Sequence, residues 1–285
     1  MKNTDLFRCP ICSSKMDIDH GKSLICLNNH CFDLARSGYV NFLTRPVKTE
    51  YDKTMFKSRS IISKSGFFEP MVDAVADKIA DSVYESGSGR MTILDAGCGE
   101  GSHLYQITEK LYSKTKSKIE LTGAGMDISK EGIQIASRQY PDCIWCVGDL
   151  TNSPFADGKF DVILNILSPS NYAEFKRLLT DEGLLIKVVS GTDYLRELRE
   201  VLLYNQTGKQ SYSNENVLKH FSDNFNLVDS RQIYYQKNMD TKLLAHLIKM
   251  TPLSWNAENQ AVEQAIDSIK GSITVDYNIL YGKKS

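Results

Sequence analysis

Leu94-Asp95-Ala96-Gly97-Cys98-Gly99-Glu100-Gly101 follows the apolar run 91–94 and opens onto a helix-like stretch at 102–112. A strand that turns on glycines into the start of a helix lets the backbone approach a ligand unusually closely. The turn that holds a pyrophosphate has the pattern Gly-x-Gly-x-x-Gly and a free helix N-terminus. Here the pattern is acid-x-Gly-x-Gly-x-Gly, with Asp95 before the turn and Glu100 within it. These carboxylates would repel a pyrophosphate, so the stretch predicts a site for a cationic nucleoside that includes Gly97, Gly99 and Gly101.

Three later strand ends carry polar residues in the same way. The run 119–126 ends in Asp127, which is suited to bind both ribose hydroxyls, and the run 143–147 ends beside Asp149, which is suited to the adenine edge. A fourth run, 160–164, leads into the loop at 165–169. Open α/β sheets bind ligands at the C-terminal ends of their strands. A tight turn or a buried acid explains any one of these features, but the series predicts S-adenosylmethionine as the cofactor.

The remaining periodic segments complete an α/β sheet. A fifth strand is predicted at 184–189, and the alternating, aromatic-rich runs 225–235 and 273–281 suit a final antiparallel pair. Helices are predicted between them. The predicted fold is therefore a Rossmann-like, seven-stranded class I methyltransferase sheet at 91–285.

The segment 46–90 is predicted to be a linker followed by lid helices. A helical stretch starts near Tyr51 and stops at Gly66, and a second helix has an apolar face formed by Val72, Val75, Ala76 and Ile79. Phe68, at the start of that helix, is placed either to pack against the cofactor or to join the aromatic core.

The N-terminal segment 1–45 contains two pairs of metal-binding residues. Cys9-Pro10-Ile11-Cys12 is followed by Cys26 and His30, with Cys31 next to the histidine. Two ligand pairs on short turns are typical of a closed, tetrahedral structural zinc site. Cys31 is an alternative fourth ligand, and free buried cysteines or a redox pair are weaker alternatives. The segment therefore predicts a zinc ribbon with Cys9, Cys12, Cys26 and His30 as ligands.

Composition narrows the class of protein. The chain has 285 residues, no apolar run long enough for a membrane span, and seven cysteines that cluster as for a metal, so we expect a cytoplasmic protein. Residues 1–64 carry 11 Lys and Arg against 6 Asp and Glu, whereas the remainder carries 23 against 29. A basic front segment suggests a polyanionic partner. Tyr39 and Phe42 are expected either to stack on unpaired bases or to cover the metal site.

Together, these motifs resemble the bacterial 23S rRNA guanine-N1 methyltransferase family. The resemblance is carried by the Cys-Pro-x-Cys and Cys-x-x-x-His pairs, Phe-Asp-x-Ala at 32–35, Gly-Tyr-Val-Asn at 38–41 and the glycine turn, and it covers nearly the whole chain. Ser-Pro-Ser-Asn-Tyr at 168–172 and Met-Thr-Pro at 250–252 match as well. Tyr51-Asp52-Lys53 and Leu185-Ile186-Lys187-Val188 are most similar to the Gram-positive branch, which is associated with macrolide (tylosin-type) resistance.

The resemblance implies several roles. The substrate would be a guanine in a hairpin loop of 23S rRNA near the peptide exit tunnel, held by a homodimer whose paired ribbons grip the hairpin. Gly99 and Glu100 would contact the cofactor. Phe68 stands where members often have Tyr, and Tyr194 where some have His, and both positions line the cofactor pocket in the family. Each departure keeps an aromatic ring but loses or changes its polar tip.

The acceptor base is expected against the loop after the fourth strand, with Asn165, Ser168, Pro169 and Asn171 as candidate contacts. Guanine N1 carries a proton with a pKa of roughly 9, so a base or solvent must remove it. The amide of Asn165 cannot act as that base, and the sequence shows no other clear catalytic base. Two alternatives to an rRNA methyltransferase are a small-molecule methyltransferase and a non-catalytic RNA-binding protein of the same fold.

Overall fold

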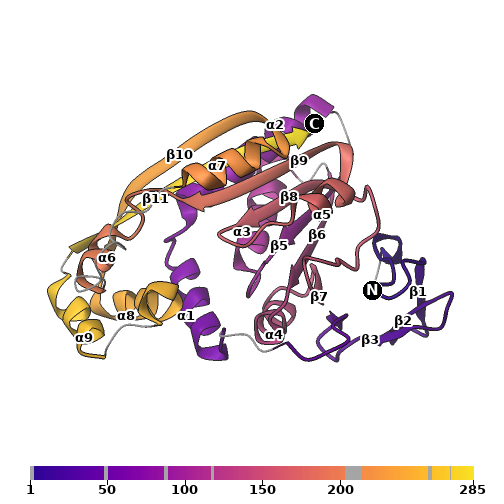
Figure 1. The fold of residues 1–285 in the computed structure, drawn as a ribbon, viewed down its shortest axis with the longest axis horizontal. Coiled ribbons are helices and arrows are strands. Elements are labelled where there is room, and N and C mark those ends of the chain that lie inside the picture. Colours follow the sequence, from indigo (N-terminus) through magenta and orange to yellow (C-terminus); the bar gives the residue numbers. More distant parts are fainter. Residues whose placement is uncertain are drawn as a thin grey trace.

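A computed structural model describes residues 3–47, 51–86, 89–116, 119–202, 214–255, 259–269 and 271–285. Its centre is one large mixed sheet with helices on both sides (Figure 1). The strands are ordered β10 (Phe225–Met239), β11 (Gly271–Lys284), β9 (Leu179–Ser190), β8 (Phe160–Ile166), β5 (Arg90–Ala96), β6 (Glu120–Asp127), β7 (Ile144–Val147) and β4 (Val40–Asn41). The class I methyltransferase fold is therefore confirmed, with one addition to the predicted seven strands.

The eighth strand comes from the N-terminal module. Val40 and Asn41 of β4 pair in parallel with Cys146 and Val147 of β7, so the closing strand of the ribbon extends the edge of the large sheet. A two-residue strand has little stability on its own and is formed here because β7 offers it unpaired backbone groups. Sequence periodicity cannot detect so short an element.

The strand order creates a crevice at the centre of the sheet. From β5 the chain passes to β6 and β7 on one side, then returns to β8 and β9 on the other, all in parallel. Such a switch point opens a ligand site at the carboxyl ends of the strands. β5 places the glycine turn at this position.

Two apolar clusters cover the two faces of the sheet. Neighbouring residues of β5 point to opposite sides, so Ile93 joins one cluster and Leu94 the other. The first cluster includes residues of α2 (Glu69–Ser86), α3 (Ser102–Lys114) and α4 (Lys130–Gln139). The second includes residues of α5 (Tyr172–Leu178), α7 (Glu215–Ser222) and the N-terminal module.

A helical cap lies beyond the sheet, at the left of Figure 1. It contains α1 (Lys53–Lys64), α6 (Arg196–Leu202), α8 (Thr241–Met250), the short helix η2 (Pro252–Ser254) and α9 (Asn259–Ser268). The Asp52 carboxylate accepts a hydrogen bond from Met55 N at 2.6 Å and starts α1, which ends before Gly66 as predicted. None of the described helices is long and apolar enough to cross a membrane.

The N-terminal module shares its core with the sheet. After the turn η1 (Thr4–Leu6), it forms an antiparallel sheet of β1 (Met16–Asp19), β2 (Ser23–Cys26) and β3 (Cys31–Asp33). Phe7 stacks on Phe42 at 5.5 Å and on Phe155 of the large domain at 5.2 Å. Phe42 is 4% exposed and Tyr39 is 7% exposed, so of the two alternatives for these rings, stacking on RNA bases is excluded by their burial. The ribbon is too small to form a separate core, so its aromatic rings join the core that it shares with the large sheet.

Candidate functional site

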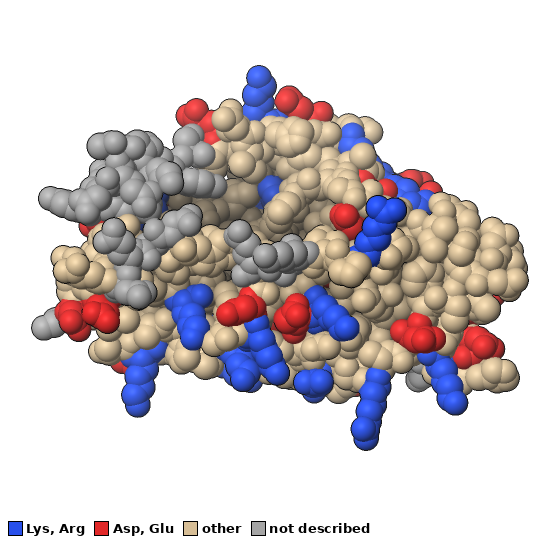
Figure 2. Space-filling view, turned by 60° about the horizontal axis from the view of Figure 1, so that its bottom comes forward, with Lys and Arg blue, Asp and Glu red and all other residues tan. Residues whose placement is uncertain are grey.

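A cavity of about 650 Å³ lies at the carboxyl ends of the central strands, between the sheet and the helical cap. Its volume is in the range of pockets that hold drug-sized ligands. Figure 2 shows a hollow on one face of the molecule. The residues that line the cavity come from α1, the glycine turn, four strand ends and η2, and include Tyr51, Phe56, Arg59, Gly97, Gly99, Asp127, Asp149, Ser168, Pro169, Ser170, Asn171, Lys187, Tyr194 and Thr251.

The glycine turn has a backbone that other residues adopt only with strain. Gly97, Gly99 and Gly101 have φ values of 85°, 58° and 83°. A Cβ at Gly97 would lie 2.7 Å from the Cβ of Ser168, and one at Gly101 would lie 2.4 Å from the buried ring of Trp145. Gly97 and Gly99 line the cavity, whereas Gly101 packs beneath it.

Two of the predicted carboxylates lie in the cavity wall. Asp127 accepts hydrogen bonds from Gly99 N and Ser129 N, both at 2.8 Å, so it also fixes the turn that it faces. Burial raises the pKa of Asp127. Asp149 accepts a hydrogen bond from Thr151 N at 2.8 Å. The structure therefore brings the ends of β5, β6 and β7 together as the sequence predicted.

The other two carboxylates lie behind the turn. Asp95 is 1% exposed, and neither carboxylate oxygen has a hydrogen-bond partner among the described residues. Burial raises the pKa of Asp95 to about 7. Glu100 is fully buried, forms an ion pair with Arg59 at 3.0 Å and accepts a hydrogen bond from Ser102. The unpartnered carboxylate of Asp95 and the absence of Cβ atoms in the turn fit a ligand that carries an ammonium group.

Arg59 is a cavity residue that the sequence analysis missed. It extends from α1 toward the glycine turn and connects the helical cap to Glu100. The sequence did contain a signal for Arg59. Met55, Phe56 and Ile62 define the buried face of α1, and Arg59 falls on that face at helical spacing.

Phe68 and Tyr194 have different positions. Tyr194 lines the cavity, with its ring 5.0 Å from the ring of Tyr277. Phe68 is 1% exposed, packs edge-on against His103 with ring centres 4.6 Å apart, and is not among the lining residues. The structure therefore places Phe68 in the aromatic core, which was its alternative.

The acceptor loop, residues 165–171, is held by its own side chains. The Asn165 amide is fully buried and donates to Ser168 Oγ at 2.6 Å and to Pro169 O at 2.9 Å. Ser168 Oγ donates to Ala96 O at 2.7 Å. Asn171 Oδ1 caps α5 by accepting from Glu174 N at 3.2 Å, and its amide nitrogen donates to Leu150 O at 3.1 Å. Ser168, Pro169 and Asn171 reach the cavity, but Asn165 lies behind it.

Lys187 is the second residue missed. It lies in β9 and lines the cavity, and its Nζ donates to Asn165 Oδ1 at 2.7 Å and to Ser170 Oγ at 2.6 Å. A lysine within the apolar strand 184–189 was the sequence signal, because a charge in a buried strand requires polar partners.

The predicted zinc ligands form one cluster. One ligand atom from each of Cys9, Cys12, Cys26 and His30 lies within 4.8 Å of the others. Cys31 is exposed and outside this cluster, so it does not replace His30. Hydrogen bonds from Ser14 lower the pKa of Cys12 to about 5, which favours the thiolate that binds metal. Three thiolates and one imidazole fit a structural zinc ion.

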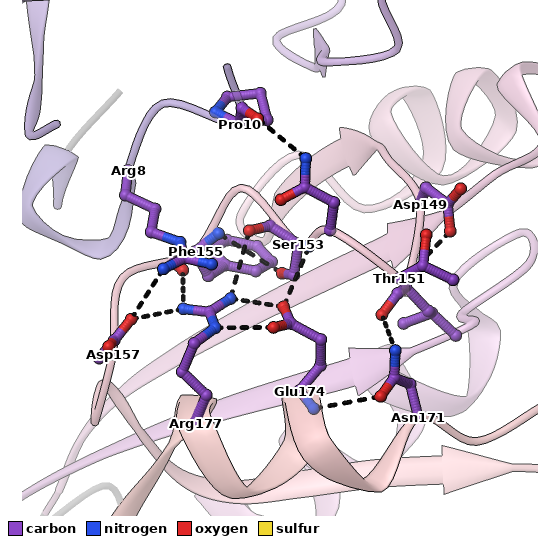
Figure 3. A network of polar contacts seen from close by, with 12 residues as sticks. Arg8, Pro10, Asp149, Thr151, Ser153, Phe155, Asp157, Asn171, Glu174 and Arg177 are labelled. Atoms are coloured by element: carbon purple, nitrogen blue, oxygen red, sulfur yellow. Dashed lines mark hydrogen bonds and ion pairs between the residues drawn. The ribbon is translucent and has the colours of Figure 1, made fainter. Parts of the chain in front are cut away.

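A polar network joins the metal-binding turn to the cavity (Figure 3). Asn152 donates to Pro10 O, between two of the cysteines, at 2.8 Å. Arg8 and Arg177 both bind Asp157, at 3.3 and 2.6 Å. Arg177 also binds Glu174, whose backbone N–H is the group that Asn171 caps.

Comparisons with known proteins agree with this arrangement. Residues 7–51 match the family model described as RlmA, N-terminal, a zinc ribbon, and residues 88–248 match a methyltransferase domain. The chain is 46% identical over the full length of both sequences to YxjB of Bacillus subtilis (strain 168), whose name assigns it to 23S rRNA guanine-N1 methylation. The chain belongs to the 23S rRNA (guanine-N1)-methyltransferase family. Within this family it is also 28% identical to the 23S rRNA (guanine(748)-N(1))-methyltransferase of Streptomyces fradiae, covering 96% of this chain and 94% of that one.

Solved structures with a similar fold are more distant. The MccD protein aligns with 72% of this chain and 96% of its own at 18% identity, with a TM-score of 0.46. The predicted family, fold class and cofactors are confirmed by the family models and the full-length relatives. As a family member, the protein is an S-adenosylmethionine-dependent methyltransferase with a structural zinc ribbon.

Proposed function

We propose that this protein transfers a methyl group from S-adenosylmethionine to N1 of a guanine in a hairpin loop of 23S rRNA. The observation that carries the proposal is the direct packing of the glycine turn on the acceptor loop. Only the missing Cβ of Gly97 allows Ser168 to approach it. Donor and acceptor sites that share one wall hold the reacting atoms close together, and methyl transfer needs little more than such positioning.

The donor half of the cavity has a group for each part of S-adenosylmethionine. We assign the amino-acid end to the glycine turn with Asp95 and Glu100 behind it, the ribose to Asp127, the adenine to Asp149, and an aromatic wall to Tyr194. Phe68 lies in the core, where it packs against His103, whose Nδ1 is 3.4 Å from the Arg59 guanidinium. Methyl transfer from the sulfonium is the chemistry that the bound donor supplies.

The acceptor half needs an unpaired base. Guanine N1 lies on the Watson–Crick edge, so the target guanine must leave any stack or pair before it enters the cavity. Ser168, Pro169 and Asn171 form the wall that this base would face. A loop of a hairpin supplies such a base at a smaller unstacking cost than a duplex.

The zinc ribbon is assigned to RNA docking. It shares a core with the sheet and is connected through Asn152 to the loop of Asp149, so RNA bound to the ribbon would be held in a fixed position relative to the cavity. Figure 2 shows basic and acidic side chains interleaved on the visible face. We further propose a homodimer whose two ribbons grip the hairpin.

A small-molecule methyltransferase is the second candidate function, since the glycine turn is common to both classes. The ribbon favours RNA, because a small substrate requires no docking module. The intact turn argues against a non-catalytic RNA-binding protein. By family resemblance, we also propose a cytoplasmic enzyme whose target lies near the peptide exit tunnel and whose activity contributes to macrolide (tylosin-type) resistance.

The direct test is to map the modification. Total 23S rRNA from a strain lacking the gene, before and after incubation with purified protein and S-adenosylmethionine, would be analysed by reverse transcription, which stops at an N1-methylguanine. One new stop in a hairpin loop is expected, together with a rise in the tylosin concentration that inhibits the complemented strain. Methyl transfer to metabolites without a stop in rRNA would favour the second candidate.

A further inference from the structure

Lys187 is a buried cation whose partners are all neutral. It is 5% exposed, and its Nζ contacts Asn165 Oδ1, Ser170 Oγ and, at 3.5 Å, Ser168 O. Among the described residues no carboxylate lies within ion-pair distance of it. Burying an ammonium without a counter-charge is costly, so its presence in a cavity wall requires another explanation.

Hydrogen-bond accounting shows two short bonds and one long, weakly held donor on Lys187. An ammonium has three N–H groups, and two of them are engaged at 2.6 and 2.7 Å. The third contact, to Ser168 O at 3.5 Å, is at the limit of a hydrogen bond. The side chains of Asn165, Ser168 and Ser170 already bind one another, so Lys187 is the cation in this wall with a donor that can turn to a ligand.

We propose that Lys187 donates a hydrogen bond to O6 of the acceptor guanine and stabilises the negative charge that develops there when N1 loses its proton. This inference rests on the proposed function and deepens it, by naming a catalytic residue for the acceptor base. When the N1–H bond breaks, the proton passes to water and the electron pair stays on the purine, spread between N1 and O6. N1 then uses its electron pair to bond to the methyl carbon as the carbon–sulfur bond breaks, and the pair of the broken bond stays on sulfur and neutralises the sulfonium.

The surroundings of Lys187 leave it mostly protonated at neutral pH but lower its pKa toward that range. Burial lowers the pKa of Lys187 to about 8, so roughly 90% of it is protonated at pH 7. Ser170, which holds Lys187, also contacts the Tyr172 hydroxyl from α5. The other titratable groups around the cavity lie on other walls and do not contribute to the shift; they are Tyr51, Arg59, Asp127, Asp149 and Tyr194.

The test compares Lys187→Met, Lys187→Arg and the wild-type enzyme in single-turnover reactions on transcribed 23S rRNA, with saturating donor and N1-methylguanine measured by reverse-transcription stops. Lys187→Met should react about 100- to 1,000-fold more slowly at pH 7, because it lacks one charge-stabilising donor. Lys187→Arg, which keeps the charge but cannot accept a proton, should stay within about tenfold of the wild type. Donor affinity should change less than about twofold in both variants, because donor binding does not involve Lys187.

The pH profile separates charge stabilisation from a structural role. The rate of Lys187→Met should rise about tenfold from pH 7 to 8 and about fivefold from pH 8 to 9, because solvent then ionises guanine N1, whose pKa is roughly 9. Above about pH 8 the wild-type kcat/KM should rise less steeply than the rate of a variant that cannot lose this proton, because the free enzyme then loses the ammonium proton of Lys187. Lys159→Met, which removes a partly exposed lysine from an ion pair with Asp5, is the control and should leave both profiles unchanged.

Three results would overturn the proposal. One is a Lys187→Met enzyme as fast as the wild type. Another is a slow Lys187→Met enzyme whose rate does not rise with pH, which would mean a structural role. The third is an inactive Lys187→Arg enzyme, which would make Lys187 a general base, because arginine keeps the charge but cannot accept a proton. If Lys187→Met does not fold, Lys187→Arg and the wild-type profile still decide. A wild-type enzyme that makes no N1-methylguanine would instead refute the proposed function.

Discussion

The two halves of the cavity are built in different ways. The donor half is formed by backbone: three glycines at positive φ and strand-end carboxylates that bind backbone N–H groups. The acceptor half is formed by side chains: Asn165, Ser168, Ser170 and Lys187 bind one another across two strands and a loop. The first arrangement is a property of a short sequence, and the second exists only after the strands have paired.

This difference predicts different responses to mutation. The backbone turn should fail where an added Cβ is both strained and in a clash, as at Gly97 and Gly101. A side-chain network has several members, so loss of one hydrogen bond should cost less than loss of the central cation. The following experiments test that contrast, from the largest expected effect to the smallest.

Gly97→Ala should have the largest effect, because Gly97 lies where the two halves touch. Its Cβ would be 2.7 Å from Ser168 at a φ of +85°, so both donor binding and the acceptor loop should be disturbed. Methylation should fall at least about 100-fold. Calorimetric titration with S-adenosylmethionine and single-turnover rates would measure the two effects. Gly158→Ala is the matched control, since its φ is +63° but its Cβ would meet nothing closer than 4.0 Å. Equal losses in both variants would mean that backbone strain alone is responsible.

Cys9→Ser should affect RNA and leave the donor half intact. Loss of one thiolate from the cluster should release zinc and loosen the ribbon, since small metal modules fold with their metal. We expect RNA affinity to fall about 30-fold and donor affinity to stay within about threefold. Metal analysis, filter binding and calorimetry would measure these changes. Cys31→Ser, at an exposed cysteine outside the cluster, should behave as the wild type. Stoichiometric zinc in Cys9→Ser would disprove this ligand set.

Asp95 should make donor binding depend on pH. Its pKa is raised to about 7 by burial, and the ammonium group of the donor favours the ionised carboxylate. Donor affinity should therefore increase about tenfold from pH 6 to pH 8, because the protonated fraction of Asp95 falls over that range. Asp95→Asn cannot ionise, so its affinity should be lower and flat with pH. A parallel pH dependence in wild type and variant would rule Asp95 out as the titrating group.

Asn171 should give the smallest effect. Asn171→Ala removes the cap of α5 and should lower the free energy of unfolding by about 1 kcal/mol. Asn171→Asp keeps the capping oxygen but loses the donor to Leu150 O, so its stability should stay near that of the wild type while activity falls a few-fold. Urea denaturation and single-turnover rates would separate the two roles. Identical behaviour of the two variants would show that the donor to Leu150 O, which both lack, accounts for this residue, and not the cap.

The sequence predicted more of the donor half than of the acceptor half. Gly97, Gly99, Asp127, Asp149 and Tyr194 all lie in the cavity wall, and their assignment to the donor stays a prediction. Asn165 was expected at the wall and lies behind it, because a polar side chain at the end of a buried strand was satisfied internally. The division at residues 45 and 90 also stays a prediction, and the structure describes a ribbon that shares its core with the sheet.

Sequence alone determined the features that depend on neighbouring residues: the positive-φ glycine turn, the order of strands and their polar ends, and the spacing of four zinc ligands. Tertiary structure decided which side chains enter the cavity from distant elements, as Arg59 does from α1 and Lys187 from β9. The physical reason is the distance along the chain over which each property is set. Backbone conformation and ligand spacing are set within a few residues, whereas the environment of a buried charge is set by strands and helices that meet only when the chain has folded.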